Sequence, residues 1–241
     1  MYRAILLFLL LAGNARAFTL PENCRQMILG VVDDMQGSEF AIRRYEKSPG
    51  GDWVPVGEPI PARGGSAGFA WGRGLYPVPA EGPVKKEGDR KTPCGVFALG
   101  GAYGYAIGIR KHPRLPYRKV ELGDLWVEDP ESLVYNEFVS LGRPPDDDWE
   151  RRQQMRLDDP AHALRLFIAC NAPPDVEPGA GSAIFFHIWR GDGAIATAGC
   201  TSMAADELSK LLMWVNPELS PLYALLPRAV YERVKTEWKL P

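Results

Sequence analysis

The chain has 241 residues, of which 46% are hydrophobic and 24% are charged, and its formal net charge is −2. This balance is typical of a globular protein with one sizeable core, and a net charge so close to zero argues against nucleic acid as a main partner. The 25 glycines and 22 prolines indicate short strands joined by many turns.

Residues 1–17 are predicted to be a signal peptide rather than part of the fold. Arg3 supplies a positive charge, residues 4–12 form a short apolar run, and residues 15–17 read Ala-Arg-Ala, a pattern that precedes signal-peptide cleavage. The run is too short to hold the protein in a bilayer, so no membrane anchor is expected. We therefore predict an exported protein, periplasmic or associated with the cell wall, whose residues 18–241 form a single domain.

Residues 25–60 read as a series of short strands. Residues 27–32 are apolar, residues 40–45 alternate between apolar and polar side chains, and residues 53–56 follow after a turn. Runs of this length, bounded by glycine, proline or aspartate, are typical of β-rich domains. We expect the first two runs to pair as a hairpin and the whole segment to complete the same β assembly as the later strands.

The rest of the chain predicts further strands and two helices, so the fold class expected is β-rich α+β. The later strand candidates are residues 91–97, 120–126, 164–170, 183–188 and 221–226. One helix is expected after Cys200, with an apolar stripe of Leu208, Leu211, Leu212 and Val215. A second helix is expected over residues 229–238 at the C-terminus.

The stretch 185–203 carries the residues that point to chemistry. It contains His187 and Cys200, 13 positions apart, with Gly199 directly before the cysteine. A thiol is a good nucleophile only as the thiolate, and a neighbouring imidazole or helix start lowers its pKa from about 8.5. We therefore predict that Cys200, just before a helix N-terminus, is a nucleophile and that His187 is its base.

The other three cysteines are Cys24, Cys94 and Cys170. In an oxidising compartment an even number of cysteines points to disulfides, but a catalytic Cys200 leaves at most one pair among these three. Cys94 and Cys170 lie in apolar, strand-like runs, so the alternative is that both are buried small hydrophobic residues.

Two motifs resemble those of a known family. His187, Thr197, Gly199 and Cys200 resemble the signature of the L,D-transpeptidase catalytic domain, also called the YkuD domain, in which a histidine is followed by Ser/Thr-x-Gly-Cys. Residues 91–97, KTPCGVF, resemble the family's Thr-Pro-x-Gly-x-Phe strand. The motifs occur in the family's order, and the resemblance covers roughly residues 75–226.

The chain also departs from the family pattern at three points. The histidine and cysteine are closer together than is usual, Ala198 stands where the family has a second histidine, and Ser202 stands where arginine or asparagine is common. These differences are typical of a divergent subgroup. The resemblance implies a β-sandwich or barrel with a helix after the nucleophile and a C-terminal helix.

The resemblance further implies acyl transfer on peptidoglycan stem peptides through a thioester, in cell-wall remodelling. The N–H groups of Gly199 and Cys200 are expected to stabilise the oxyanion, while Arg190 and Thr197 are assigned to substrate binding, Arg190 through a substrate carboxylate. Asp192 or a backbone carbonyl would orient His187. No cofactor or metal is expected, because the remaining histidines lack zinc-ligand spacing.

Three alternatives to the transpeptidase remain open. An L,D-carboxypeptidase would hydrolyse the same thioester with the same Cys–His pair. A distinct exported cysteine hydrolase would act on other peptides. A non-catalytic cell-wall-binding module would keep the fold without the reaction, and the absence of the second histidine favours it.

Overall fold

The computed structural model describes residues 18–79 and 81–241, so the predicted signal peptide lies outside the described residues. The strands are β1 (Gln26–Val32), β2 (Glu39–Glu46), β3 (Val54–Arg63), β4 (Phe69–Trp71), β5 (Thr92–Gly104), β6 (Tyr117–Lys119), β7 (Asp124–Trp126), β8 (Phe138–Ser140), β9 (Leu164–Ile168), β10 (Phe185–Ile188), β11 (Thr201–Met203) and β12 (Leu222–Pro227). The helices are α1 (Asp148–Arg152), α2 (Ala205–Trp214) and α3 (Arg228–Val234). The predicted β-rich α+β class is confirmed.

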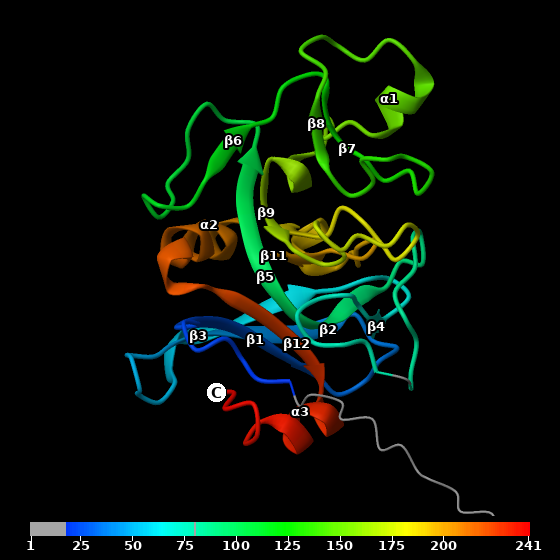
Figure 1. The fold of residues 1–241 in the computed structure, drawn as a ribbon. Helices are drawn as coiled ribbons and strands as arrows, with labels where there is room; N and C mark the ends of the chain where they lie inside the picture. The colour runs from blue at the N-terminus through cyan, green and yellow to red at the C-terminus, as the bar shows by residue number, and fades with distance from the viewer. Residues whose placement is uncertain (1–17, 80) are drawn as a thin grey trace, which may run out of the picture.

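Eight of the strands close into a barrel. They follow the order β12-β1-β2-β3-β11-β10-β9-β5, and β5 pairs back with β12. The pairs β1–β12 and β10–β11 are parallel, and β1 and β2 form the predicted antiparallel hairpin. β4 and β6 extend the sheet from the two ends of the long strand β5, which runs up through the middle of the molecule in Figure 1.

The barrel interior is filled by alternate side chains of its strands. Phe186 of β10 and Tyr223 of β12 are fully buried, and their ring centroids lie 4.7 Å apart. The Tyr223 hydroxyl lies 3.2 Å from the hydroxyl of Thr201, which comes from β11. Because successive residues of a strand point to opposite faces, the neighbours of Phe186 in β10 point out of the barrel.

A segment that we call the cap, residues 105–163, covers this outward face. It carries β6, the two-stranded sheet of β7 and β8, and α1, and it forms the upper part of the molecule in Figure 1. Val120, Trp126 and Met155 of the cap pack with Phe185 in a second apolar cluster, separate from the barrel interior. The outer face of β10 therefore lies between the barrel wall and the cap.

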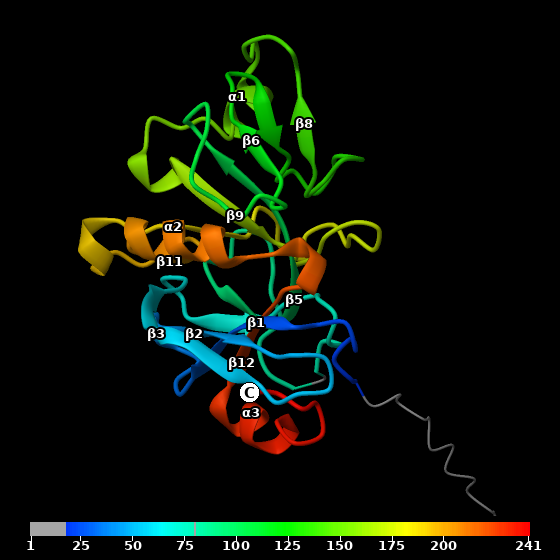
Figure 2. The ribbon, with the colours of Figure 1, turned by 90° about the vertical axis from the view of Figure 1, so that its left-hand side faces the viewer.

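The helices α2 and α3 pack against strands of the barrel. Leu208, Leu211 and Leu212 of α2 are fully buried against β9 and β10, which confirms the predicted apolar stripe, and Figure 2 shows this helix lengthwise. α3 lies below the barrel beside β12 and ends at Val234, earlier than predicted.

The prediction that a helix follows directly after Cys200 is wrong. Residues 201–203 form β11, which pairs with β10, and α2 begins only at Ala205. The pairing satisfies backbone groups in the barrel wall that a helix starting at residue 201 would leave without partners. The α2 N-terminus is therefore separated from Cys200 by a whole strand.

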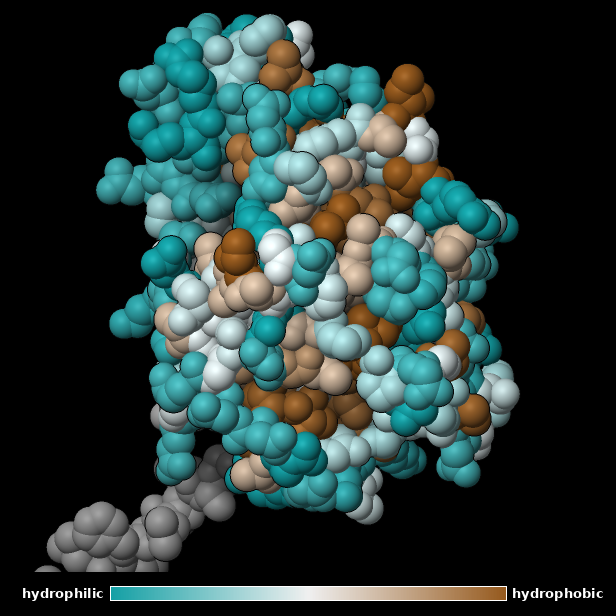
Figure 3. All heavy atoms as spheres, turned by 180° about the vertical axis from the view of Figure 1, so that it is seen from behind, coloured by the Kyte–Doolittle hydropathy of each residue, from teal (hydrophilic) through white to brown (hydrophobic). Residues whose placement is uncertain are grey.

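No helix within the described residues is long and apolar enough to cross a membrane. Seen from behind, the surface is mixed, with apolar side chains running down its middle and a strongly hydrophilic region at the upper left (Figure 3). That hydrophilic region lies on the side of α1, a helix built almost entirely of charged residues.

Candidate active site

β10 and β11 bring His187 and Cys200 to the same side of the sheet. The two strands are parallel, with Phe186 opposite Thr201 and His187 opposite Ser202. Residues opposite one another point to the same face, so Ser202 and, two positions earlier, Cys200 share the face of His187. From a strand spacing of about 4.8 Å and a rise of about 3.3 Å per residue, the Cα atoms of the pair lie about 8 Å apart.

The turn before Cys200 is held by Thr197. The Thr197 hydroxyl accepts a hydrogen bond from the Gly199 N–H at 3.0 Å and donates one to the Cys200 carbonyl at 2.6 Å. Gly199 has a φ of +142°, and a Cβ there would stand 3.1 Å from the Lys91 carbonyl oxygen, so the position favours glycine.

These contacts change two of the predicted roles. Thr197 is buried, and its hydroxyl bonds shape the turn, so it does not offer them to a substrate. The Gly199 N–H is already bonded to Thr197, so it is not a free oxyanion donor. Gly199 serves the site through its backbone conformation instead.

The Cys200 thiol is partly exposed and is bonded to the backbone of the chain beside it. Sγ accepts from the Phe185 N–H at 3.4 Å and donates to the Ala183 carbonyl at 3.3 Å. Burial raises the pKa of this thiol to about 11, although the Phe185 N–H and the charge of Arg165 act in the opposite direction. The prediction of a thiolate at neutral pH is therefore wrong.

The His187 side chain is 3% exposed, and its tautomer is fixed by the backbone. Nδ1 lies 2.7 Å from the Ile188 carbonyl oxygen, which can only accept, so Nδ1 carries the proton and Nε2 is the basic nitrogen. A backbone carbonyl thus orients the ring, and Asp192 does not. Burial, with a smaller contribution from the Arg190 charge, lowers the pKa of His187 to about 4, so the ring is neutral at pH 7.

The two groups are close without being bonded. Within the part of the chain that the structure describes, no hydrogen bond joins Cys200 Sγ to His187 Nε2. Proton transfer therefore requires the Cys200 side chain to rotate away from the Ala183 carbonyl.

Arg190 does not have the role that the sequence predicts. Its guanidinium forms an ion pair with Asp159, and Nη2 lies 3.0 Å from Nε2 of His162. The His162 ring in turn lies against the His187 ring, with centroids 5.0 Å apart. Arg190 is therefore a support for the two histidines, and its charge is already paired with Asp159 rather than free for a substrate carboxylate.

The sequence did not predict Arg165 as a site residue, and Ser202 was noted only as a departure from the family pattern. Arg165 of β9 stands opposite His187, and Ser202 of β11 stands opposite it on the other side. Both are buried, and each has a side-chain atom with no hydrogen-bond partner among the described residues, Nε of Arg165 and Oγ of Ser202. The available signal was an arginine in the otherwise apolar run 164–168.

A carboxyl group of the cap also acts on the thiol. The Glu128 side chain keeps contact with solvent, but the protein around it and the charge of Glu87 raise its pKa to about 7. Its negative charge raises the pKa of Cys200. Glu87 accepts hydrogen bonds from Tyr135 and from Ser182, the latter at 2.7 Å.

Other features of the described residues lie outside this site. All four cysteines are free thiols, and Cys94 and Cys170 are buried, as small hydrophobic residues would be.

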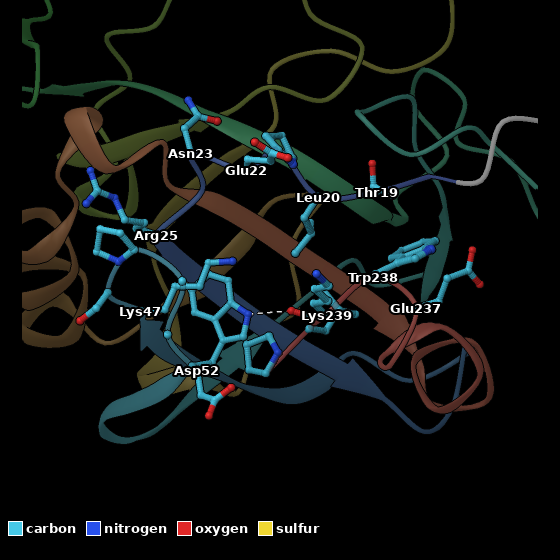
Figure 4. Close-up of a pocket in the computed structure, with 18 residues that line it drawn as sticks. Thr19, Leu20, Glu22, Asn23, Arg25, Lys47, Asp52, Glu237, Trp238 and Lys239 are labelled. Atoms are coloured by element: carbon cyan, nitrogen blue, oxygen red, sulfur yellow. Dashed lines mark hydrogen bonds between the residues drawn. The ribbon is translucent and has the colours of Figure 1, made fainter.

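Asp146, Asp147 and Glu150 hold their carboxylates within 4.8 Å of one another, but Asp147 caps α1 and Glu150 pairs with Arg143. A hollow of about 1150 Å³ lies between residues 19–25, residues 47–53 and the C-terminus, as Figure 4 shows.

Comparison of the chain with protein-family models, with curated protein sequences and with solved structures gives no match.

Proposed function

We propose that this protein is an exported cysteine acyltransferase that acts on peptidoglycan stem peptides, an L,D-transpeptidase of a divergent subgroup. The observation that carries the proposal is the parallel register of β10 and β11, which gives His187 and Cys200 one shared face. The His187 tautomer, with the proton on Nδ1 and Nε2 free to accept one, supports a role as general base. The closed barrel is compatible with the β-sandwich or barrel that the family resemblance implies, although β11 separates the cysteine from α2.

The reaction would begin from a neutral pair rather than an ion pair. The Cys200 Sγ–H bond breaks as the proton passes to His187 Nε2 and Sγ bonds to the peptide carbonyl carbon. When the tetrahedral intermediate collapses, the C–N bond breaks, and the leaving amine takes the proton from Nε2. An acceptor amine then attacks the thioester carbon and loses a proton to Nε2. The C–S bond breaks as the new amide forms, and Sγ takes the proton from Nε2, which restores the Cys200 thiol.

Two other outcomes use the same site. In an L,D-carboxypeptidase, water replaces the acceptor amine and the thioester is hydrolysed. A non-catalytic cell-wall-binding module is favoured by one observation, the two hydrogen bonds that hold Sγ against the backbone of residues 183–185.

Incubation with purified tetrapeptide muropeptides, followed by mass spectrometry, tests the proposal. Transpeptidation gives cross-linked dimers with loss of the terminal residue, whereas hydrolysis gives tripeptides alone. Cys200→Ala should give neither product. Wild-type protein that binds the muropeptides but leaves them unchanged would overturn the enzyme and support the binding module.

A further inference from the structure

Arg165 is a buried positive charge without a negative partner. Its side chain is 4% exposed, and Nη2 donates to the Met155 carbonyl at 2.7 Å. Nε is buried and has no acceptor, and no carboxylate within the described ranges forms an ion pair with the guanidinium. The nearby Arg190, by contrast, is paired with Asp159. Burial of a charge is costly unless a counter-charge compensates it, so this site is incomplete without an anion.

Arg165 lies beside the reacting sulfur. The guanidinium carbon stands 5.7 Å from the centre of the Phe185 ring, and the Phe185 N–H is the group that bonds Cys200 Sγ. Phe185 therefore contacts both groups, and the positive charge of Arg165 lowers the pKa of the Cys200 thiol. An anion bound to Arg165 would lie on the Phe185 side of the reacting sulfur.

The neighbours of Arg165 suit a carboxylate. Tyr103 and Tyr105 are close enough for their phenol groups to affect the pKa of Arg165. The Tyr105 oxygen accepts from the Leu157 N–H at 3.1 Å, which leaves its O–H free to donate. A planar guanidinium and a phenol donor together match the two oxygens of one carboxylate.

The charge count favours a monoanion. Lys85 and Arg190, the other cations that act on Cys200 and His187, are each paired with an aspartate. Arg165 is the one of these three cations without an ion-pair partner among the described residues, and a single guanidinium suits a carboxylate better than a phosphate dianion.

We propose that Arg165 binds the terminal carboxylate of the acyl donor, so that Cys200 attacks the last peptide bond and the terminal residue leaves. This inference rests on the proposed function and adds what the site recognises, the end of a peptide rather than its interior. Arg165 is then a substrate-binding residue of the site, in the place that the sequence assigned to Arg190.

The test compares a tetrapeptide muropeptide that ends in a free carboxylate with the same peptide as its C-terminal amide. For wild-type protein, kcat/KM for the acid should exceed that for the amide by about 10- to 100-fold, the value of a lost hydrogen-bonded charge pair. Arg165→Met should reduce this ratio to about 1. Arg165→Lys keeps a charge but not the planar fork, so it should lower the ratio only part of the way.

Arg156→Met is the matched control. Arg156 also lies over an aromatic ring, at 4.8 Å from Tyr105, and also donates to a backbone carbonyl, that of Val120. It should leave the acid-to-amide ratio unchanged. If Arg165 only tied the cap to β9, its variants would slow both substrates equally, and an unchanged ratio in Arg165→Met would overturn the inference.

Binding separates this inference from the proposed function. If wild-type protein turns over neither peptide, binding of both is measured by calorimetry with the Cys200→Ala protein. A preference for the acid that Arg165→Lys weakens would support the carboxylate site although the acyltransferase had failed. Equal binding of acid and amide would overturn it, as would equal turnover of the two by an active wild-type enzyme.

Discussion

The two faces of β10 differ in how completely their polar groups are satisfied. On the inward face, Phe186 packs on Tyr223, and the one polar pair, Thr201 and Tyr223, is hydrogen-bonded. On the outward face, three groups around His187 are buried without a partner among the described residues. They are Ser202 Oγ, Arg165 Nε and His162 Nδ1. The same short strand therefore serves a complete core on one side and an incomplete polar cluster on the other.

This difference shows where buried polar groups of the fold lack the hydrogen bonds that would stabilise it. Buried polar groups in native proteins almost always have partners, and the exceptions call for an explanation. Of the seven such side-chain atoms among the described residues, three gather around one histidine, since Arg165 and Ser202 both stand opposite His187 and the His162 ring lies against it. Clustering of this kind is expected where a ligand, rather than the protein, supplies the missing partners.

The largest expected effect comes from the outward face. Cys200→Ala should reduce turnover of muropeptides by about 10⁴-fold or more, because no other thiol is placed beside His187. Cys170→Ala is the matched control. Its thiol is fully buried, with a pKa raised to about 12 by that burial, and its removal should leave turnover within a few-fold of wild type. Turnover that survives in Cys200→Ala, measured by mass spectrometry, would remove the sulfur from the mechanism.

A substitution on the inward face should lower the stability of the protein rather than its activity. Phe186→Ala removes a fully buried ring from the barrel interior and should lower the free energy of unfolding by about 3–5 kcal/mol. Phe167→Ala, on the outward face of β9 and only half-buried, should cost less. Urea unfolding of both variants checks this order. The reverse order would mean that the cap, and not the barrel, holds the main core.

Sequence patterns predicted the inward face well because it depends on local patterns of hydrophobic residues. Apolar runs placed β1, β9 and β10, alternation placed β2, and the leucine stripe placed α2. The outward face depends on register between strands far apart in the chain, and no local pattern fixes which residue of β9 stands opposite His187. Arg165 was therefore missed, and the free carboxylate-binding role went to Arg190, whose partner Asp159 lies 31 positions away.

The pKa of the Cys200 thiol could not be predicted from the sequence for the same reason. It depends on how deeply the cap and residues 183–185 bury Cys200, and on β11 separating the cysteine from the α2 N-terminus. The His–Cys pair itself was found because a motif spaces it along the sequence. The motif does not predict the protonation states of His187 and Cys200 before the reaction.

A fall in pH should weaken the outward face through its two histidines, against a smaller gain from Glu128, whose raised pKa makes its protonation favourable in the folded state. Burial lowers the pKa of His187 to about 4 and that of His162 to about 3, whereas both rings have their ordinary pKa near 6.5 when the chain unfolds. The unfolded chain therefore binds more protons between pH 6.5 and 4, so stability is full above pH 6.5 and falls as the pH drops through that window. For His187 the loss approaches about 3 kcal/mol below pH 4.

Urea unfolding at pH 7 and pH 4.5 measures this loss. The double variant His162→Gln with His187→Gln should show a smaller difference between the two pH values than wild type, since its folded and unfolded states bind similar numbers of protons. An equal difference in wild type and variant would place the acid sensitivity elsewhere.

The smallest effect expected is at the turn that presents the thiol. Gly199→Ala introduces a Cβ at a φ of +142° and at 3.1 Å from the Lys91 carbonyl oxygen, so it should lower stability by about 1–3 kcal/mol and shift Cys200. Gly179→Ala is the matched control, because Gly179 also has a positive φ, +79°, but has nothing within 4 Å of its Cβ position. It should cost about 1 kcal/mol and leave the alkylation rate of Cys200 unchanged. If the two variants behave alike in both urea unfolding and alkylation, backbone strain alone explains Gly199, and the close approach to Lys91 does not position the thiol.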